Sequence, residues 1–146
     1  MGNLKLTSSA FEDGCEIPRE CGYKNGNKVP PLTVSGIPEG TKSLSLIMDD
    51  PDAMEPAGKV WVHWVAWNIE PTTTELENLT TEGKTDFGEV GYGGPAPPDK
   101  RHTYVFKLYA LDSELDLPDE STKADVEKTM EGHIIEQTTL TGTYAP

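Results

Sequence analysis

The feature that most constrains the fold is the run 59–69, KVWVHWVAWNI. Its odd and even positions are both apolar, so a strand here is expected in the middle of a sheet and buried on both faces. The runs 43–49 and 103–111 are short and apolar, and the second is also rich in aromatic and β-branched residues, as strands are. Shorter strands are expected over 4–7 and 134–140. The chain therefore reads as mainly β.

A helix is indicated only near the end of the chain. Thr122 and Asp125 form a capping-box pattern, Val126 and Met130 follow four residues apart, and Gly132 is a stop signal. The 14 Gly and 12 Pro favour ordered loops between the strands. The pattern predicts an all-β plan with one late helix.

Charge and length exclude several classes of protein. The 25 acidic and 12 basic residues give a net charge of -13, which disfavours nucleic acid and anionic membranes as partners. An acidic surface either attracts a basic partner or keeps the protein soluble. No apolar run reaches the roughly 18 residues of a membrane span, and no signal peptide is evident, so a cytoplasmic protein is expected. Residues 1–146 are expected to form one domain. Cys15 and Cys21 could be a short disulfide or free thiols.

Polar side chains interrupt these apolar strands. His63 shares its parity with Trp61 and Trp67, so the three are expected on one face of the sheet. His102 and Tyr104 share parity at the start of the third strand. Each alone has a simpler explanation, such as a core histidine or a packed tyrosine. Together they predict one cavity, surrounded by Asp50 or Asp52, Trp61, His63, His102 and Tyr104.

The order of these residues is also informative. The chain carries, in sequence, the blocks Asp50-Pro51-Asp52-Ala53, Trp61-x-His63-Trp64, Gly94-Pro95-Ala96-Pro97-Pro98 and His102-x-Tyr104. This order resembles the two signature blocks of the phosphatidylethanolamine-binding protein family. Further segments across nearly the whole chain, such as Thr85-Asp86-Phe87-Gly88, resemble its bacterial and archaeal Raf-kinase-inhibitor-like branch.

The resemblance implies a Greek-key-type antiparallel β-sandwich and a non-enzymatic, regulatory binding protein without cofactor or metal. Its cavity would bind phosphate, acetate or the phosphoryl head group of a lipid. The ligand-binding residues carried over are Asp50, Asp52, Trp61, His63, Gly94, Pro95, His102 and Tyr104. Members often form homodimers, and some are known as serine protease inhibitors or kinase modulators, so a protein partner of that kind is a further expectation.

The anion is expected to be held locally, because the net charge opposes it. Backbone N–H groups of the turn 91–94 would form an anion-binding nest, the two histidines could each donate, and one or both of them would do so as cations. Three alternatives remain open: a hydrolase that uses His63, His102 and Asp50, a zinc site made from the same residues, and a protease inhibitor or interaction module.

Overall fold

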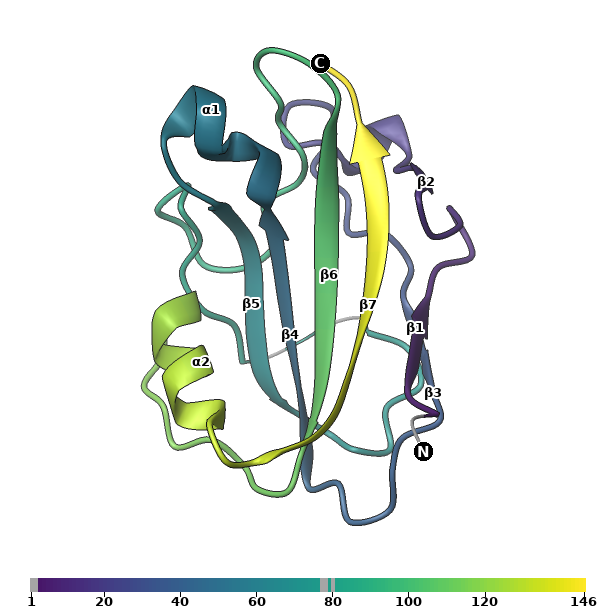
Figure 1. Ribbon diagram of the computed structural model, residues 1–146, viewed down its shortest axis with the longest axis vertical. Helices are drawn as coiled ribbons and strands as arrows, with labels where there is room; N and C mark the ends of the chain where they lie inside the picture. Colours follow the sequence, from purple (N-terminus) through teal and green to yellow (C-terminus); the bar gives the residue numbers. More distant parts are fainter. Residues whose placement is uncertain (1–2, 77–78, 80) are drawn as a thin grey trace.

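A five-stranded sheet forms the larger layer of the protein (Figure 1). The computed structural model describes residues 3–76, 79 and 81–146. The strands lie in the order β2–β7–β6–β4–β5. Their bounds are Cys15–Glu16 for β2, Ser43–Asp50 for β4, Trp61–Ile69 for β5, His102–Leu111 for β6 and Ile134–Tyr144 for β7. Neighbours are antiparallel except β2 and β7, which are parallel.

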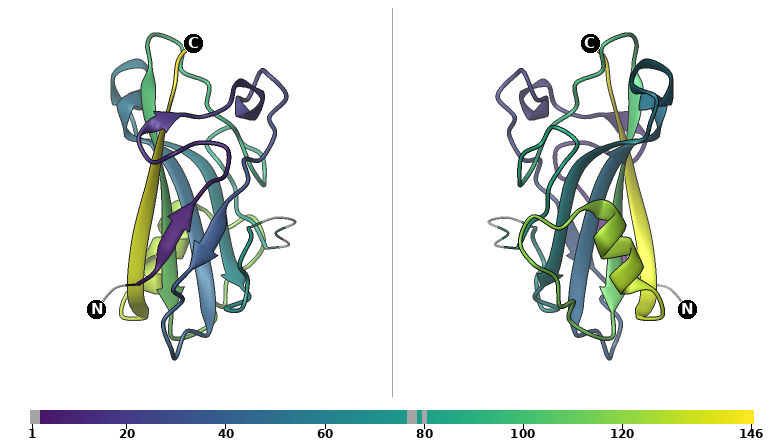
Figure 2. Two further views of the ribbon diagram at one scale, coloured as in Figure 1. Left: turned by 90° about the vertical axis from the view of Figure 1, so that its right-hand side faces the viewer. Right: turned by 90° about the vertical axis from the view of Figure 1, so that its left-hand side faces the viewer.

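A second, smaller layer covers one face of this sheet (Figure 2). It is the antiparallel pair β1 (Lys5–Thr7) and β3 (Thr33–Ser35). Helix α2 (Lys123–Met130) packs on the opposite face. Single turns lie at Arg19–Cys21, Pro51–Ala53 and α1 (Met54–Ala57). The mainly-β prediction is confirmed, with two sheets and one helix longer than a single turn in the described part of the chain.

Two apolar cores lie on the two faces of the large sheet. All eight residues of β4 are buried, and they alternate between the faces. Leu46 packs with Phe106 beneath the small sheet, whereas Ile47 packs with Trp67 beneath α2. The sequence prediction of a buried strand at 43–49 is therefore confirmed.

The predicted helix is confirmed together with its cap. The Thr122 hydroxyl accepts from the Asp125 amide at 3.4 Å, and the Asp125 carboxylate accepts from the Thr122 amide at 3.0 Å. These bonds satisfy amides that a helix start leaves unpaired. Val126 and Met130 face the core, and Gly132 follows the helix with a φ of 81°.

The prediction that 59–69 lies in the middle of a sheet is wrong. β5 is an edge strand, next to β4 only. Irregular backbone of residues 81–93 covers its free edge: Trp67 donates to Thr81 at 3.2 Å, Gly83 to Val65 at 2.7 Å and Gly93 to His63 at 2.8 Å. This loop supplies the hydrogen bonds of a neighbouring strand, which allows an apolar edge strand.

Candidate functional site

A β-bulge in β5 aims the first site residue. Met48 lies opposite Trp64 and Asp49 lies opposite Val62, so His63 is an extra residue without a partner across the sheet. The bulge reverses the alternation of side chains. His63 and Trp64 therefore face the small-sheet side, while Trp67 packs under α2. The expectation that His63 and Trp67 share a face is wrong for this reason.

The bulge opens onto a cavity of about 190 Å³. It lies where β4 ends and where β5 and β6 begin, beside α1 and the loop that precedes β6. The lining residues are Asp50, Ala53, Ala57, Trp61, His63, Phe87, Ala96, Pro98 and His102. Four residues expected from the sequence thus meet here: Asp50, Trp61, His63 and His102.

His102 lies between two carboxylates. Its Nδ1 is 2.6 Å from Asp50 Oδ2 and its Nε2 is 2.7 Å from Asp99 Oδ1. A ring whose two nitrogens both face carboxylates carries a proton on each and is a cation. Burial opposes this charge, but the hydrogen bonds to Asp50 and Asp99 outweigh burial and raise the pKa of His102 above its ordinary value. The two carboxylates differ in exposure: the Asp50 side chain is 4% exposed and that of Asp99 is 36% exposed.

Asp50 is held in place by the turn that follows β4. Its Oδ1 accepts from the Asp52 amide at 2.9 Å and caps the 3-10 turn Pro51–Ala53. Asp52 itself turns outward, and its Oδ2 accepts from the Thr103 amide at 2.8 Å. Asp52 thus ties the turn to the start of β6 and does not line the cavity.

His63 differs from His102 in charge. Its Nδ1 lies 2.7 Å from the Gly93 carbonyl oxygen. Because a carbonyl oxygen only accepts hydrogen bonds, Nδ1 carries the proton and donates. Burial lowers the pKa of His63 and outweighs the opposing effects of Gly93 and Asp50. The ring is therefore neutral at pH 7, and its Nε2 is a hydrogen-bond acceptor. Of the two histidines, only His102 is a cation, which lies within the expectation that one or both would be.

Tyr104 lies behind the cavity between the two histidines. Its ring centroid is 5.1 Å from that of His63 and 6.3 Å from that of His102. Its hydroxyl is buried without a partner of hydrogen-bond geometry among the described residues. Burial raises the pKa of Tyr104 far above its ordinary value, and the nearby Asp50 carboxylate adds to this shift. The hydroxyl is therefore protonated at pH 7 and lies near the Asp50 carboxylate.

The predicted anion-binding nest at 91–94 is wrong. The Gly91 amide donates to the Gly83 carbonyl at 3.3 Å, and the Gly93 amide donates to His63. The Gly94 amide donates to Asn27 Oδ1 at 2.7 Å. These three amides secure the loop and are not available to an anion.

Gly94 and Pro95 anchor the loop against the segment 21–23 and do not line the cavity. A Cβ atom at Gly94 would collide with the Cys21 carbonyl oxygen, so only glycine allows the two backbones to approach. The Pro95 carbonyl accepts from the Tyr23 amide at 2.9 Å. Cys21, which is buried, and the exposed Cys15 are both free thiols.

Sequence reasoning did not single out two residues of the site. Phe87 stacks on Tyr23 with ring centroids 4.1 Å apart and meets Trp61 edge-on at 5.7 Å, so it forms an aromatic wall. Asp99 covers His102 Nε2. In the sequence, Asp99 is marked only by its position three residues before His102. The described residues contain no group of three or more His, Cys, Asp or Glu that could hold a metal ion.

Comparison with known proteins agrees with this arrangement. The sequence profile of phosphatidylethanolamine-binding proteins matches residues 7–145. The chain belongs to this family. It is 42% identical to a UPF0098 protein of Methanothermobacter thermautotrophicus, over 97% of this chain and 98% of the relative. Archaeal and bacterial relatives of this kind confirm the predicted branch.

Two solved structures of the family are similar along almost their whole length. A phosphatidylethanolamine-binding protein homologue of Chlamydia trachomatis superposes with a TM-score of 0.93 at 37% identity, covering 99% of this chain and 98% of that one. YbcL of E. coli, described as a new member of the mammalian family, superposes with a TM-score of 0.88 at 32% identity and covers 98% of both chains. The family fold is thus present throughout the described chain.

Proposed function

We propose that the cavity binds a small anion, of the phosphate, phosphomonoester or carboxylate class, through His102 Nε2. The ligand oxygen takes the position that the Asp99 carboxylate holds in the unliganded protein. One charge replaces another, so the cationic ring keeps two anionic partners throughout. The net charge of the chain then matters little, because the exchange is local.

This proposal rests on the difference in exposure between the two carboxylates that contact His102. Asp50 is buried and fixed by the turn that it caps, whereas Asp99 lies in the exposed stretch between Pro97 and His102. An exposed ion pair contributes little free energy, so a ligand can displace Asp99 at small cost. A buried pair is costly to break, so Asp50 stays and holds the charge on His102.

The other polar groups select the ligand. Neutral His63 lines the cavity and presents an acceptor at Nε2, whereas the Tyr104 hydroxyl is buried behind the cavity. A ligand that carries both an oxyanion and a proton therefore satisfies His102 and His63. Inorganic phosphate is partly protonated at pH 7, a phosphomonoester, with a second pKa of about 6, is protonated to a smaller extent, and sulfate is not protonated. The volume of about 190 Å³ is below the usual range for drug-sized ligands and suits a head group rather than an acyl chain.

Binding is proposed rather than hydrolysis by His63, His102 and Asp50. Both nitrogens of His102 are paired with carboxylates, so the ring does not accept a proton from water, and the free Nε2 of His63 is assigned to the proton of the ligand. No helix of the described chain is long and apolar enough to cross a membrane. A regulatory role, the cytoplasmic location, the homodimer and a serine protease partner stay predictions.

Calorimetric titration with phosphate at pH 7 tests the proposal. Asp99→Ala removes the competing carboxylate and is expected to tighten phosphate binding about three- to tenfold. His102→Gln removes the charged donor and should abolish binding. Asp116→Ala, at an exposed aspartate, makes the same change in net charge and should leave the affinity unchanged.

Three outcomes contradict the proposal. One is an unchanged or weaker affinity in Asp99→Ala, and another is phosphate binding that survives His102→Gln. The third is equal affinity for sulfate and phosphate, which would show that the ligand proton is not recognised.

A further inference from the structure

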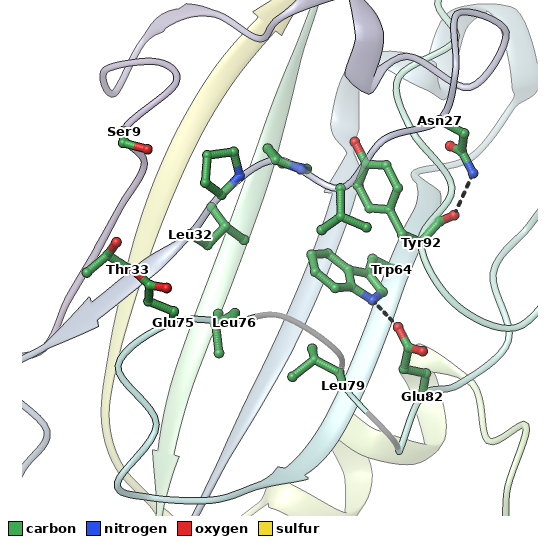
Figure 3. Close-up of a pocket in the computed structure, with 13 residues that line it drawn as sticks. Ser9, Asn27, Leu32, Thr33, Trp64, Glu75, Leu76, Leu79, Glu82 and Tyr92 are labelled. Atoms are coloured by element: carbon green, nitrogen blue, oxygen red, sulfur yellow. Dashed lines mark hydrogen bonds between the residues drawn. The ribbon is translucent and has the colours of Figure 1, made fainter.

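A second and larger cavity lies on the small-sheet side, beside the same strand β5 (Figure 3). Its volume is about 650 Å³, within the usual range for small-molecule sites. The side chains that matter are Trp64, Tyr92, Leu32, Leu76, Glu75 and Glu82. None of them lines the cavity at His102. The two cavities are therefore built from different side chains.

The floor of this groove is aromatic and fixed. Trp64 is 2% exposed, and its indole N–H donates to Glu82 Oε2 at 2.7 Å. Tyr92 meets the indole edge-on, with ring centroids 5.2 Å apart and an interplanar angle of 84°. The Tyr92 hydroxyl in turn donates to the Cys21 carbonyl at 2.9 Å. Each ring is thus fixed by one hydrogen bond and by its contact with the other ring, so the groove is preformed.

The wall is built from two segments that are far apart in the sequence. The Leu76 amide donates to the Leu32 carbonyl at 3.0 Å, and Thr33 forms a β-bridge with Glu75. This pairing places two leucine side chains and one carboxylate beside the aromatic floor (Figure 3).

The charge of the lining has one sign. Among the described residues, the charged side chains that line the groove are Glu75 and Glu82, and neither has an ion-pair partner there. Glu82 uses one oxygen for the indole, and its other oxygen is not hydrogen-bonded in the described structure. The net charge of -13 adds to the negative potential. Such a groove disfavours anions and attracts cations.

We propose that this groove binds a small organic ammonium ion with an aromatic or branched apolar body. The body packs on the partly exposed side chains of Tyr92 and Leu79, above the buried indole of Trp64, and the ammonium group pairs with the Glu82 carboxylate. The aromatic ring of Tyr92 stabilises a cation as well as an apolar group. The proposal is independent of the anion site, since it uses none of the residues of that site.

The experiment uses a matched pair of probes, 3-phenylpropylamine and 3-phenylpropionate, which share one apolar body and differ in charge. The readout is the indole N–H signal of Trp64 in ¹⁵N-correlated NMR spectra, identified with Trp64→Phe. The amine is expected to shift this signal saturably, and the carboxylate is not. Glu82→Gln should weaken amine binding about two- to fivefold, and Glu75→Gln, at the other end of the groove (Figure 3), should weaken it less. Glutamine at 82 keeps an acceptor for the indole, so the floor is preserved.

Asp116→Ala is the control for net charge and should leave the amine affinity unchanged. Saturating phosphate should not displace the amine, because the sites are separate. The proposal is overturned by equal shifts from both probes, or by no Trp64 shift up to about 10 mM amine, beyond the millimolar limit of useful affinity. Full amine affinity in Glu82→Gln, or displacement by phosphate, also overturns it.

Discussion

The two carboxylates on His102 allow a sharp test of how burial sets the strength of an ion pair. Asp50→Asn and Asp99→Asn each remove one negative charge from the same ring, and the distances to the ring are nearly equal, 2.6 and 2.7 Å. The two partners differ in exposure, at 4% and 36% of the side chain. The two substitutions are therefore matched in chemistry and differ in environment.

The loss in Asp50→Asn is expected to be large. Breaking a buried ion pair by removing one partner costs about 3–5 kcal/mol. The asparagine oxygen still accepts a hydrogen bond from the ring, so the lower end, about 3 kcal/mol, applies. In a chain of this size that corresponds to a fall in Tm of roughly 6–12 °C. Asp99→Asn should leave Tm close to that of the wild type, because water replaces the lost partner.

Urea unfolding followed by tryptophan fluorescence and thermal unfolding followed by circular dichroism measure both variants at pH 7. NMR titration of His102 should show its pKa falling in both variants, since each removes a group that raises it. Equal losses of stability in Asp50→Asn and Asp99→Asn would refute the reasoning, and so would a neutral Asp50→Asn.

Two further predictions concern pH and packing. The pKa of His102 is raised in the folded protein, so its stabilisation is fully present below the ordinary value of about 6.5 and is lost as pH rises through the folded value. The stability gap between wild type and Asp50→Asn, measured by urea unfolding from pH 6 to 9, should therefore shrink with rising pH; a constant gap contradicts this. Gly94→Ala forces a Cβ against the Cys21 carbonyl and should lower the free energy of unfolding by about 3 kcal/mol or more, whereas a Tm equal to that of wild type would show that the loop can move.

The acidic run at the end of β4 shows what sequence reasoning could establish. Carboxylates in an apolar strand need partners, and each has one. Asp49 is paired with Lys107 at 3.0 Å and Lys123 at 2.8 Å, Asp50 with His102, and Asp52 with the Thr103 amide. The need for partners followed from the sequence. Their identities did not, because they come from β6 and α2, which lie far from β4 along the chain.

The strands and the helix were predictable because their signals are local. Apolar runs and a capping box depend on neighbouring residues, and β4, β6 and α2 lie where they were expected. The edge position of β5 was not predictable, since an irregular loop supplies its missing hydrogen bonds. The side of the sheet that His63 faces relative to Trp67 depends on one unpaired residue, which leaves no mark in the pattern of apolar positions. The groove at Trp64 likewise depends on the pairing of Leu32 with Leu76.

The bulge at His63 makes the cavity depend on how many residues β5 contains. Deleting one residue between Trp61 and Trp64 would restore regular alternation: Trp61 would still lie opposite Asp50, and the single residue left between the two tryptophans would face α2. A relative with that single-residue deletion would retain the architecture and lose the histidine of β5 from the cavity. Among related chains, the spacing of these two tryptophans therefore distinguishes members able to form the hollow from members that share only the scaffold.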